Sequence, residues 1–162
     1  MNIRVGFGFD VHQLKEGRPC ILGGVLISNN KGPDGHSDAD VLIHAICDGL
    51  LGAANLRDIG FHFPNTDARY KNIDSKKLLS EVVTLLHTKK YLIGNVDVTV
   101  VLEKPKLNEH IPAMQKILSS ILKIEEDAVS IKATTSELLG YVGREEGVNA
   151  SAVVLIYKEE EK

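Results

Sequence analysis

Apolar and polar positions alternate along the first part of the chain, which is typical of a β-strand. Over residues 2–12 the recurring apolar positions are Ile3, Val5, Phe7 and Phe9. The segment CILGGVLI, residues 20–27, is predicted to form a hairpin in which Gly23-Gly24 supplies the turn or a bulge. Residues 29–38 (NNKGPDGHSD) are rich in asparagine, glycine and proline and are predicted to form a loop.

The rest of the sequence alternates between helical and extended patterns. Apolar positions at helical spacing predict helices over residues 38–54, 75–90 and 108–123. Short apolar runs predict strands over residues 96–103, 129–134 and 150–158, followed by a solvated tail over 159–162. The order β-β-α-α-β-α-β-β predicts an α+β fold with the helices packed on one face of a mixed β-sheet.

Length and charge narrow the class of protein. A chain of 162 residues suits one domain, 1–162, and its formal charge of −3 gives no basic field for nucleic acid. Cys20 and Cys47 are isolated thiols, which argues against a disulfide framework or a thiolate metal cluster. Because no signal segment opens the chain and no apolar run reaches the ~18 residues of a membrane span, we expect a soluble cytoplasmic protein without a membrane partner.

Polar residues occupy one narrow stripe of the first predicted helix. At about 100° per residue, Asp40, His44 and Asp48 fall within about 80° of one another, whereas the remaining positions are mostly apolar. A buried charge needs a partner, so the stripe is expected to face a cation, a hydrogen-bonding network or a wet cavity. An internal hydrogen bond between aspartate and histidine is the alternative.

A second pairing of carboxylate and imidazole ends the first strand. Residues i and i+2 of a strand share a face, so Asp10 and His12 point the same way. If the strand end lies against the helix, Asp10, His12 and His44 supply one oxygen and two nitrogens, which suits zinc with a fourth position open. The alternative is an ordinary pair of satisfied surface groups. Asp48 either orients an imidazole or accepts a backbone N–H group in the core.

The segment KATTSELLG, residues 132–140, has two interpretations. Thr134-x-x-Glu137 matches a capping box, in which the glutamate reaches back to a backbone N–H group. In the functional alternative, Thr134 and Thr135 bind phosphate oxygens and Glu137 binds a hard cation such as Mg²⁺.

Other polar segments are equally open to interpretation. Ser37 and Asp38 either cap the first helix, or His36 and Ser37 donate to a phosphate at its N-terminus. Arg144, in GYVGREEG, either holds an anion or is solvated. Taken alone, DIG (58–60) and PNTD (64–67) are turns, and EKPK (103–106) is the exit from a strand.

In this order, these segments closely resemble the family of 2-C-methyl-D-erythritol 2,4-cyclodiphosphate synthases, and the resemblance covers nearly the whole chain. The segments that carry it are GFDVH, GGV, HSDADVLIHAICDGLLGAA, DIG, FPNTD, GNVDVTV, PK, HIP, KATTSELLG and GREEG. An ordered set of this kind is far more specific than any one motif.

The resemblance implies both an activity and an assembly. The activity is a lyase reaction of the non-mevalonate isoprenoid pathway: 4-diphosphocytidyl-2-C-methyl-D-erythritol 2-phosphate is converted to 2-C-methyl-D-erythritol 2,4-cyclodiphosphate and CMP. The 2-phosphate attacks the β-phosphorus within the same molecule. The assembly is a homotrimer with its active sites at subunit interfaces.

The resemblance also implies the roles of individual residues. Asp10, His12 and His44 would bind zinc, Glu137 would bind Mg²⁺ or Mn²⁺, and His36 and Thr135 would stabilise the transition state. The residues implied to contact substrate are Asp10, His12, His36, Ser37, Asp58, Ile59, Gly60, Phe63, Pro64, Asn65, Thr66, Asp67, Pro105, Lys106, Ala133, Thr134, Thr135, Glu137, Tyr141 and Arg144. Those from Pro105 to Thr135 would form a cytidine pocket for the neighbouring subunit.

One departure from the family pattern concerns the three-fold axis. The resemblance places Tyr141 and Arg144 there, and Phe7 and Ser151 stand where some members have a histidine and a glutamate. Three arginines would then converge without that glutamate, so either one of the two glutamates after Arg144 or an anion must neutralise them. A prenyl diphosphate is the anion we expect, because Phe7 suits its apolar tail.

Two other functions fit the same residues. A metal-dependent phosphohydrolase would use a metal-activated water and release phosphate. A non-catalytic zinc- and nucleotide-binding module would need a fourth protein ligand, and no further cysteine or histidine is suitably placed.

Overall fold

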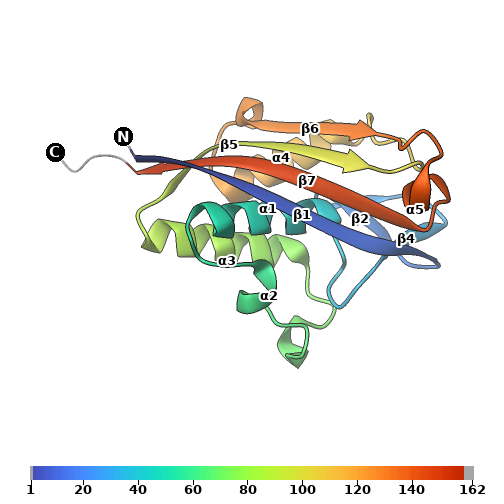
Figure 1. Cartoon of the computed structure of the whole chain (residues 1–162), viewed down its shortest axis with the longest axis horizontal. Coiled ribbons are helices and arrows are strands. Elements are labelled where there is room, and N and C mark those ends of the chain that lie inside the picture. The colour runs from blue at the N-terminus through green and yellow to red at the C-terminus, as the bar shows by residue number, and fades with distance from the viewer. Residues whose placement is uncertain (1, 159–162) are drawn as a thin grey trace.

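The computed structural model describes residues 2–158 and contains a five-stranded mixed sheet (Figure 1). Its strands are β1 (Asn2–Glu16), β4 (Lys31–Asp34), β5 (Leu92–Val101), β6 (Val129–Thr134) and β7 (Gly147–Lys158). Their order across the sheet is β4-β1-β7-β5-β6, in which only β5 and β6 are parallel. The remaining strands, β2 (Cys20–Leu22) and β3 (Val25–Ile27), form a separate hairpin. The predicted mixed sheet is confirmed.

The long helices pack on one face of this sheet, as predicted. They are α1 (Val41–Ala53), α3 (Ser75–Thr88) and α4 (Ile111–Leu122), and Figure 1 shows them gathered on the same side. Short helices and 3₁₀ turns complete the chain: α2 (Ile59–His62), η1 (Ala68–Tyr70), η2 (Glu126–Ala128) and α5 (Gly140–Gly143). None of the helices within residues 2–158 is long and apolar enough to cross a membrane. Both cysteines are buried free thiols.

Three local predictions were wrong: the end of the first strand, the loop over residues 29–38 and the turn over residues 58–60. The first strand extends to Glu16, and its last residues pair with β4 inside the segment 29–38 that was predicted as a loop. Glycine and proline marked that segment as irregular, but it lies at a sheet edge, where proline is tolerated. The segment 58–60, predicted as a turn, enters helix α2. The predicted tail, residues 159–162, lies outside the described residues.

Asp40 begins helix α1, which corrects the expectation that Ser37 or Asp38 caps it. The Asp40 carboxylate accepts the N–H groups of Ile43, Gly23 and Gly24 at 3.1, 3.0 and 2.7 Å. Burial raises the pKa of Asp40 to about 6, although these backbone donors act against that shift. Asp40 therefore joins the β2–β3 hairpin to the start of α1, and of its expected partners the structure contains the hydrogen-bonding network.

Two glycines of β1 allow helix α1 to lie directly on this strand. A Cβ atom at Gly8 would lie 1.9 Å from the carbonyl oxygen of Ala45, and one at Gly6 would lie 2.0 Å from that of Gly49. Such distances are far below van der Waals contact, so only glycine fits at either position. The close approach brings Asp10 and His12 of β1 next to the first turn of α1.

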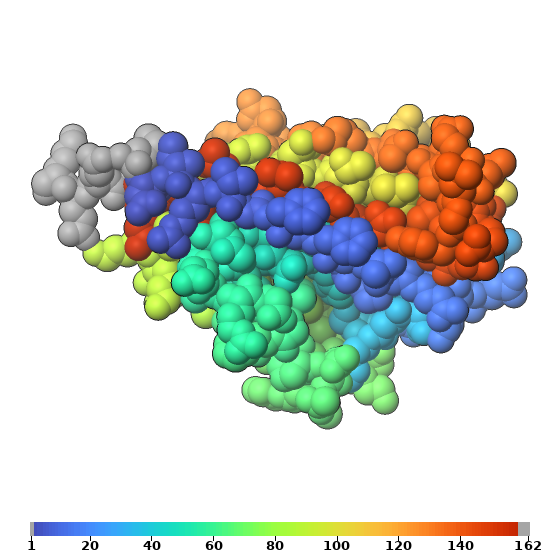
Figure 2. All heavy atoms as spheres, in the orientation of Figure 1, coloured from blue at the N-terminus to red at the C-terminus, as the bar shows by residue number. Residues whose placement is uncertain are grey.

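The opposite face of β1 is apolar and uncovered. Its outward side chains are Ile3, Val5, Phe7, Phe9 and Val11, between 46% and 65% exposed. Figure 2 shows β1 crossing the surface, with no other segment of residues 2–158 over it. A contiguous apolar surface of this kind is typical of an interface with another protein chain.

Candidate metal centre and substrate clefts

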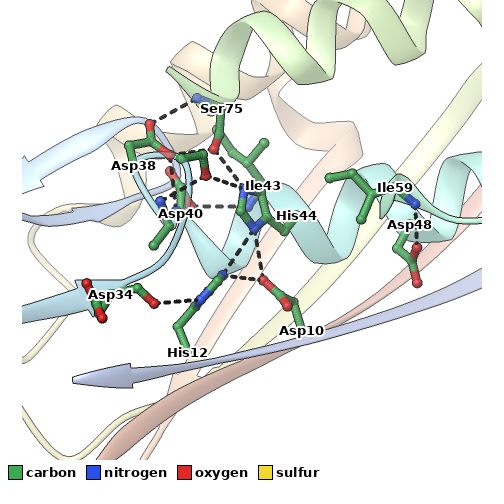
Figure 3. A network of polar contacts seen from close by, with 12 residues as sticks. Asp10, His12, Asp34, Asp38, Asp40, Ile43, His44, Asp48, Ile59 and Ser75 are labelled. Carbon is green, nitrogen blue, oxygen red and sulfur yellow. Dashed lines mark hydrogen bonds and ion pairs between the residues drawn. The ribbon is translucent and has the colours of Figure 1, made fainter. Parts of the chain in front are cut away.

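Side chains from β1 and α1 converge at one point beside the sheet (Figure 3). The Oδ2 atom of Asp10 lies 2.9 Å from His12 Nε2 and 3.0 Å from His44 Nδ1. The two nitrogens are 3.2 Å apart. The even-numbered residues of β1 face α1, which is why Asp10 and His12 both point toward His44. The predicted convergence of these three side chains is confirmed.

The charges of this triad depend on one another. Burial raises the pKa of Asp10, but hydrogen bonds and charge interactions with His12 and His44 outweigh it and lower the pKa to about 2. Burial lowers the pKa of His12, but the hydrogen bond and charge of Asp10 outweigh it and raise the pKa above its ordinary value. Asp10 is therefore a carboxylate at neutral pH, and protons compete with a cation for His12 as the pH falls.

The donor set fits a tetrahedral metal ion. The Nδ1 atom of His12 lies 3.1 Å from the carbonyl oxygen of Asp34, which only accepts, so Nδ1 carries the proton and Nε2 turns its lone pair toward Asp10. Lone pairs this close require a proton or a cation between them. Metal bonds of about 2.0–2.1 Å give ligand atoms roughly 3.3 Å apart in a tetrahedron, close to the spacing in this triad.

Polar groups also surround the far nitrogen of His44. His44 Nε2 lies 2.9 Å from Ser75 Oγ and 3.2 Å from Ser37 Oγ. Ser75 donates from its hydroxyl to Asp38 and lies at the buried start of α3. Ser37, expected to contact substrate, is 7% exposed and lies against the imidazole.

Asp48 does not orient an imidazole, because its carboxylate accepts the N–H of Ile59 at 3.1 Å. This is the second of its two expected roles, an acceptor for a backbone N–H group. Burial raises the pKa of Asp48, and the nearby charge of Asp58 acts in the same direction. The polar stripe of α1 therefore serves different partners along its length, and only His44 belongs to the metal centre.

A cleft of about 380 Å³ opens beside the triad. Of the residues expected to contact substrate, it is lined by His12, His36, Ser37, Ile59, Gly60, Phe63, Pro64, Asn65 and Thr66. Asp58 and Asp67 are absent from this lining: Asp58 accepts the N–H of Phe61, and Asp67 binds the guanidinium of Arg69. We refer to this cleft as the metal-side cleft.

A second cleft, of about 330 Å³, lies where β6 ends. Its lining includes Pro105, Lys106, Ala133, Thr134 and Thr135, which are the residues expected to form the cytidine pocket. We refer to it as the β6 cleft. The two clefts share no lining residue, and Figure 1 shows the end of β6 and helix α2 in different parts of the molecule. His36 and Thr135 therefore do not meet within one chain.

The capping-box interpretation of Thr134 and Glu137 is wrong. No helix begins at Thr134. The next helix, α5, begins only at Gly140 and has Leu139 as its N-cap residue. Glu137 has a φ angle of 54° and is exposed, and its carboxylate accepts from Thr135 Oγ1 at 3.4 Å. Its carboxylate is thus held by one long hydrogen bond and remains accessible to a cation.

Arg144 is neutralised within its own chain. Its guanidinium donates to both carboxylate oxygens of Glu146, each at 3.0 Å, and both side chains are more than half exposed. The Tyr141 hydroxyl accepts from Asn149 at 2.7 Å. Of the two expected ways to balance Arg144, the structure contains the glutamate.

Two structural carboxylates and one serine were missed from the sequence. Glu103 accepts from the Ser136 N–H and hydroxyl at 2.9 and 3.0 Å and so shapes the loop after β6. A charged residue at the end of an apolar run was the available signal. Asp38 was predicted only as a possible cap of the first helix, and Ser75 carried no signal because it is 31 residues from His44 along the chain.

A family model, related sequences and solved structures all match this chain to the same protein family. The YgbB family matches residues 3–157. A 2-C-methyl-D-erythritol 2,4-cyclodiphosphate synthase from Cytophaga hutchinsonii is 64% identical over 98% of this chain and 99% of its own length. Among solved structures, IspF from Plasmodium falciparum in complex with CDP is 35% identical, with a TM-score of 0.86 over 98% of both chains. The bifunctional IspDF of Campylobacter jejuni is 39% identical, with a TM-score of 0.94; this chain spans 43% of that protein.

Proposed function

The chain belongs to the YgbB family, and on that premise we propose how its residues convert 4-diphosphocytidyl-2-C-methyl-D-erythritol 2-phosphate to 2-C-methyl-D-erythritol 2,4-cyclodiphosphate and CMP. This is the cyclodiphosphate-forming step of isoprenoid synthesis, a phosphorus–oxygen lyase reaction that we assign to the cytoplasm. The observation that carries the proposal is the triad of Asp10, His12 and His44 at the edge of a cleft.

The reaction needs little from a protein base. The 2-phosphate is already an anion, it attacks the β-phosphorus, and the bond between that phosphorus and the bridging oxygen breaks as CMP leaves. Catalysis then depends on holding the two phosphates in line and on neutralising charge.

Positive charge in the metal-side cleft would come from metal ions held by its side chains. We assign zinc to Asp10, His12 and His44, and Mg²⁺ or Mn²⁺ to Glu137, because zinc accepts mixed nitrogen and oxygen ligands whereas Mg²⁺ prefers oxygen. When bound, these ions act as Lewis acids on the phosphate oxygens. His36 and Thr135 then position the diphosphate from the two clefts.

The two clefts divide the substrate between them. The metal-side cleft, with Ile59, Gly60 and Phe63 on its wall, suits the erythritol portion and its phosphate. The β6 cleft suits the cytidine, because the P. falciparum relative was solved in complex with CDP and because the residues lining this cleft are those that the sequence resemblance implies for the nucleotide. One molecule of substrate contacts both clefts only if different subunits supply them.

We therefore propose a homotrimer. The exposed apolar face of β1 supports it, since an interface would remove these side chains from water. Arg144 and Phe7 lie near the axis of that trimer in our proposal. A prenyl diphosphate bound there must displace Glu146 from Arg144, so the intrachain ion pair acts against binding of this predicted ligand.

Mixed trimers test the shared site. Subunits carrying His44→Ala and subunits carrying Thr135→Ala should each be inactive alone. A trimer that contains both should regain part of the activity, because one interface can combine an intact metal centre with an intact β6 cleft. Mixing is verified by native mass spectrometry, and refolded trimers of each single variant are the control. No recovery in verified mixed trimers would place each site within one chain.

Glu137→Gln is expected to leave zinc in place and to raise the Mg²⁺ or Mn²⁺ concentration needed for half-maximal activity by about tenfold or more, because an amide keeps the shape but loses the charge. Glu125→Gln, which removes an equal charge elsewhere on the surface, is the control. An unchanged titration in Glu137→Gln would contradict the cation-binding role.

Product analysis separates the proposed function from its alternatives. We expect mass spectrometry of the reaction mixture to show cyclic diphosphate and CMP in equal amounts. Free phosphate or a hydrolysed diphosphate would indicate a phosphohydrolase, and unchanged substrate with zinc bound would indicate a binding module.

A further inference from the structure

We infer that Ser75 and Asp38 are positioning residues for the metal centre: together they hold the His44 imidazole with its proton on Nε2, so that Nδ1 is free to bind metal. The inference rests on the proposed zinc site. Neither residue contacts the metal ligands Asp10 or His12, and neither belongs to the expected substrate contacts.

A series of hydrogen bonds leads from His44 away from the metal centre. His44 Nε2 lies 2.9 Å from Ser75 Oγ, and Ser75 Oγ in turn hydrogen-bonds to Asp38 Oδ1 (Figure 3). A second bond, from the Ser75 N–H to Asp38 Oδ2 at 2.9 Å, fixes the carboxylate against the start of α3. These hydrogen bonds join α1, α3 and the segment before α1.

The direction of each hydrogen bond follows from the chemistry of the groups. Asp38 is a carboxylate that only accepts, so the single hydroxyl proton of Ser75 points toward it. The Ser75 oxygen then has only lone pairs to offer His44, and the imidazole must donate from Nε2. A neutral imidazole that donates from Nε2 has its lone pair on Nδ1, which is the atom that faces Asp10 and His12.

Burial stabilises the hydrogen bonds that set the tautomer of His44. Ser75 is fully buried, so water does not compete for its hydroxyl. Ser37 Oγ, 3.2 Å from the same Nε2, accepts the N–H of Ala39 and retains a second lone pair that can accept from the imidazole. His12 is held in the equivalent way by the carbonyl oxygen of Asp34, with its free lone pair on Nε2. Both histidines therefore reach the metal centre with their tautomers fixed from outside it.

Zinc affinity is the primary test, and it does not depend on turnover. In a chelator competition assay, we expect Ser75→Ala to bind zinc about 10- to 100-fold more weakly than the wild type, the usual effect of losing a partner that orients a ligand. Ser75→Thr keeps the hydroxyl and should restore most of the affinity. Asp38→Asn should also weaken zinc binding. Both Asp38 oxygens accept from Ser75, one from its N–H group and one from its hydroxyl, and the asparagine amide would place an NH₂ group against one of these two donors.

A matched control removes a carboxylate that lies next to Ser75 in the sequence but does not take part in the hydrogen bonds from His44 to Asp38. Asp74 caps α3 through the N–H of Lys76 and does not contact His44. Asp74→Ala, which removes this cap, should therefore lower the thermal stability of the metal-free protein while leaving zinc affinity within about twofold. The opposite pattern in Ser75→Ala, reduced zinc affinity with near-normal stability, identifies a positioning role rather than a structural one.

A spectroscopic measurement on the zinc-loaded protein completes the test. The His44 Nε2–H proton should give a slowly exchanging, downfield NMR signal in the wild type and in Ser75→Thr, and should exchange rapidly in Ser75→Ala. Wild-type zinc affinity and an unchanged proton signal in Ser75→Ala would overturn the inference. The result is independent of the proposed reaction, whose failure would appear as the absence of cyclic diphosphate from the wild-type enzyme.

Discussion

A His44→Ala protein is expected to fold normally, to bind less than about a tenth of a zinc ion per chain and to retain at most roughly a thousandth of the wild-type activity. The substitution removes the only metal ligand that α1 contributes and leaves Asp10 and His12 with two ligand atoms, too few to hold zinc tightly. Charge stabilisation worth several kcal/mol would be lost, at about 1.4 kcal/mol for each tenfold in rate.

Elemental analysis and steady-state kinetics on the purified protein measure both effects. His110→Ala is a suitable control, because the His110 side chain makes no capping hydrogen bond at the start of α4. We expect this control to keep about one zinc ion per chain and near-normal activity. Full zinc content in His44→Ala would contradict the assignment of the metal centre.

Gly8→Ala is expected to lower the free energy of unfolding by about 3 kcal/mol and to weaken zinc binding at the same time. The new Cβ atom would lie 1.9 Å from the Ala45 carbonyl oxygen and 2.5 Å from the Gly49 nitrogen. Both contacts are with the backbone of α1, so no side-chain rotation relieves them and the helix must move. That movement carries His44 away from Asp10.

Gly52→Ala tests whether any alanine in this helix has the same effect. A Cβ atom at Gly52 would have no neighbour within 4 Å, so this variant should be neutral or stabilised by roughly 0.5–1 kcal/mol. Urea unfolding and chelator competition measure the two quantities for each variant. Equal stability and equal zinc affinity in Gly8→Ala and the wild type would show that the close approach of α1 and β1 does not position the metal centre.

The metal centre was predictable because its signal is local on each element. Asp10 and His12 are two residues apart in a strand, and His44 lies in a polar stripe of an otherwise apolar helix. What the sequence did not contain was a reason for the two elements to meet. That reason is the pair Gly6 and Gly8, whose missing side chains are meaningful only once α1 is in place.

The faces of β1 show a related limit. Apolar alternation normally assigns the apolar side of a strand to the core. In β1 the buried side carries glycines together with Asp10 and His12, and the apolar side, including Phe7 and Phe9, is exposed. Periodicity separates the two faces correctly but does not say which of them a helix of the same chain will cover.

Loops were the least predictable part of the site. Thr134 and Glu137 match the pattern of a capping box, yet no helix forms there because Glu103, 33 residues from Ser136, accepts hydrogen bonds from the loop and holds it in another conformation. Ser75 was invisible for the same reason, since its partners are distant in sequence. Interactions of this kind depend on the assembled fold and leave no local pattern.

We propose that the triad serves an intramolecular attack by phosphate rather than an attack by water. Turnover in water enriched in ¹⁸O, followed by mass spectrometry of the products, distinguishes the two. We expect neither the cyclic diphosphate nor CMP to carry the label, because every oxygen in both products comes from the substrate. One ¹⁸O atom in CMP, or in a hydrolysed phosphate product, would show instead that water is the nucleophile.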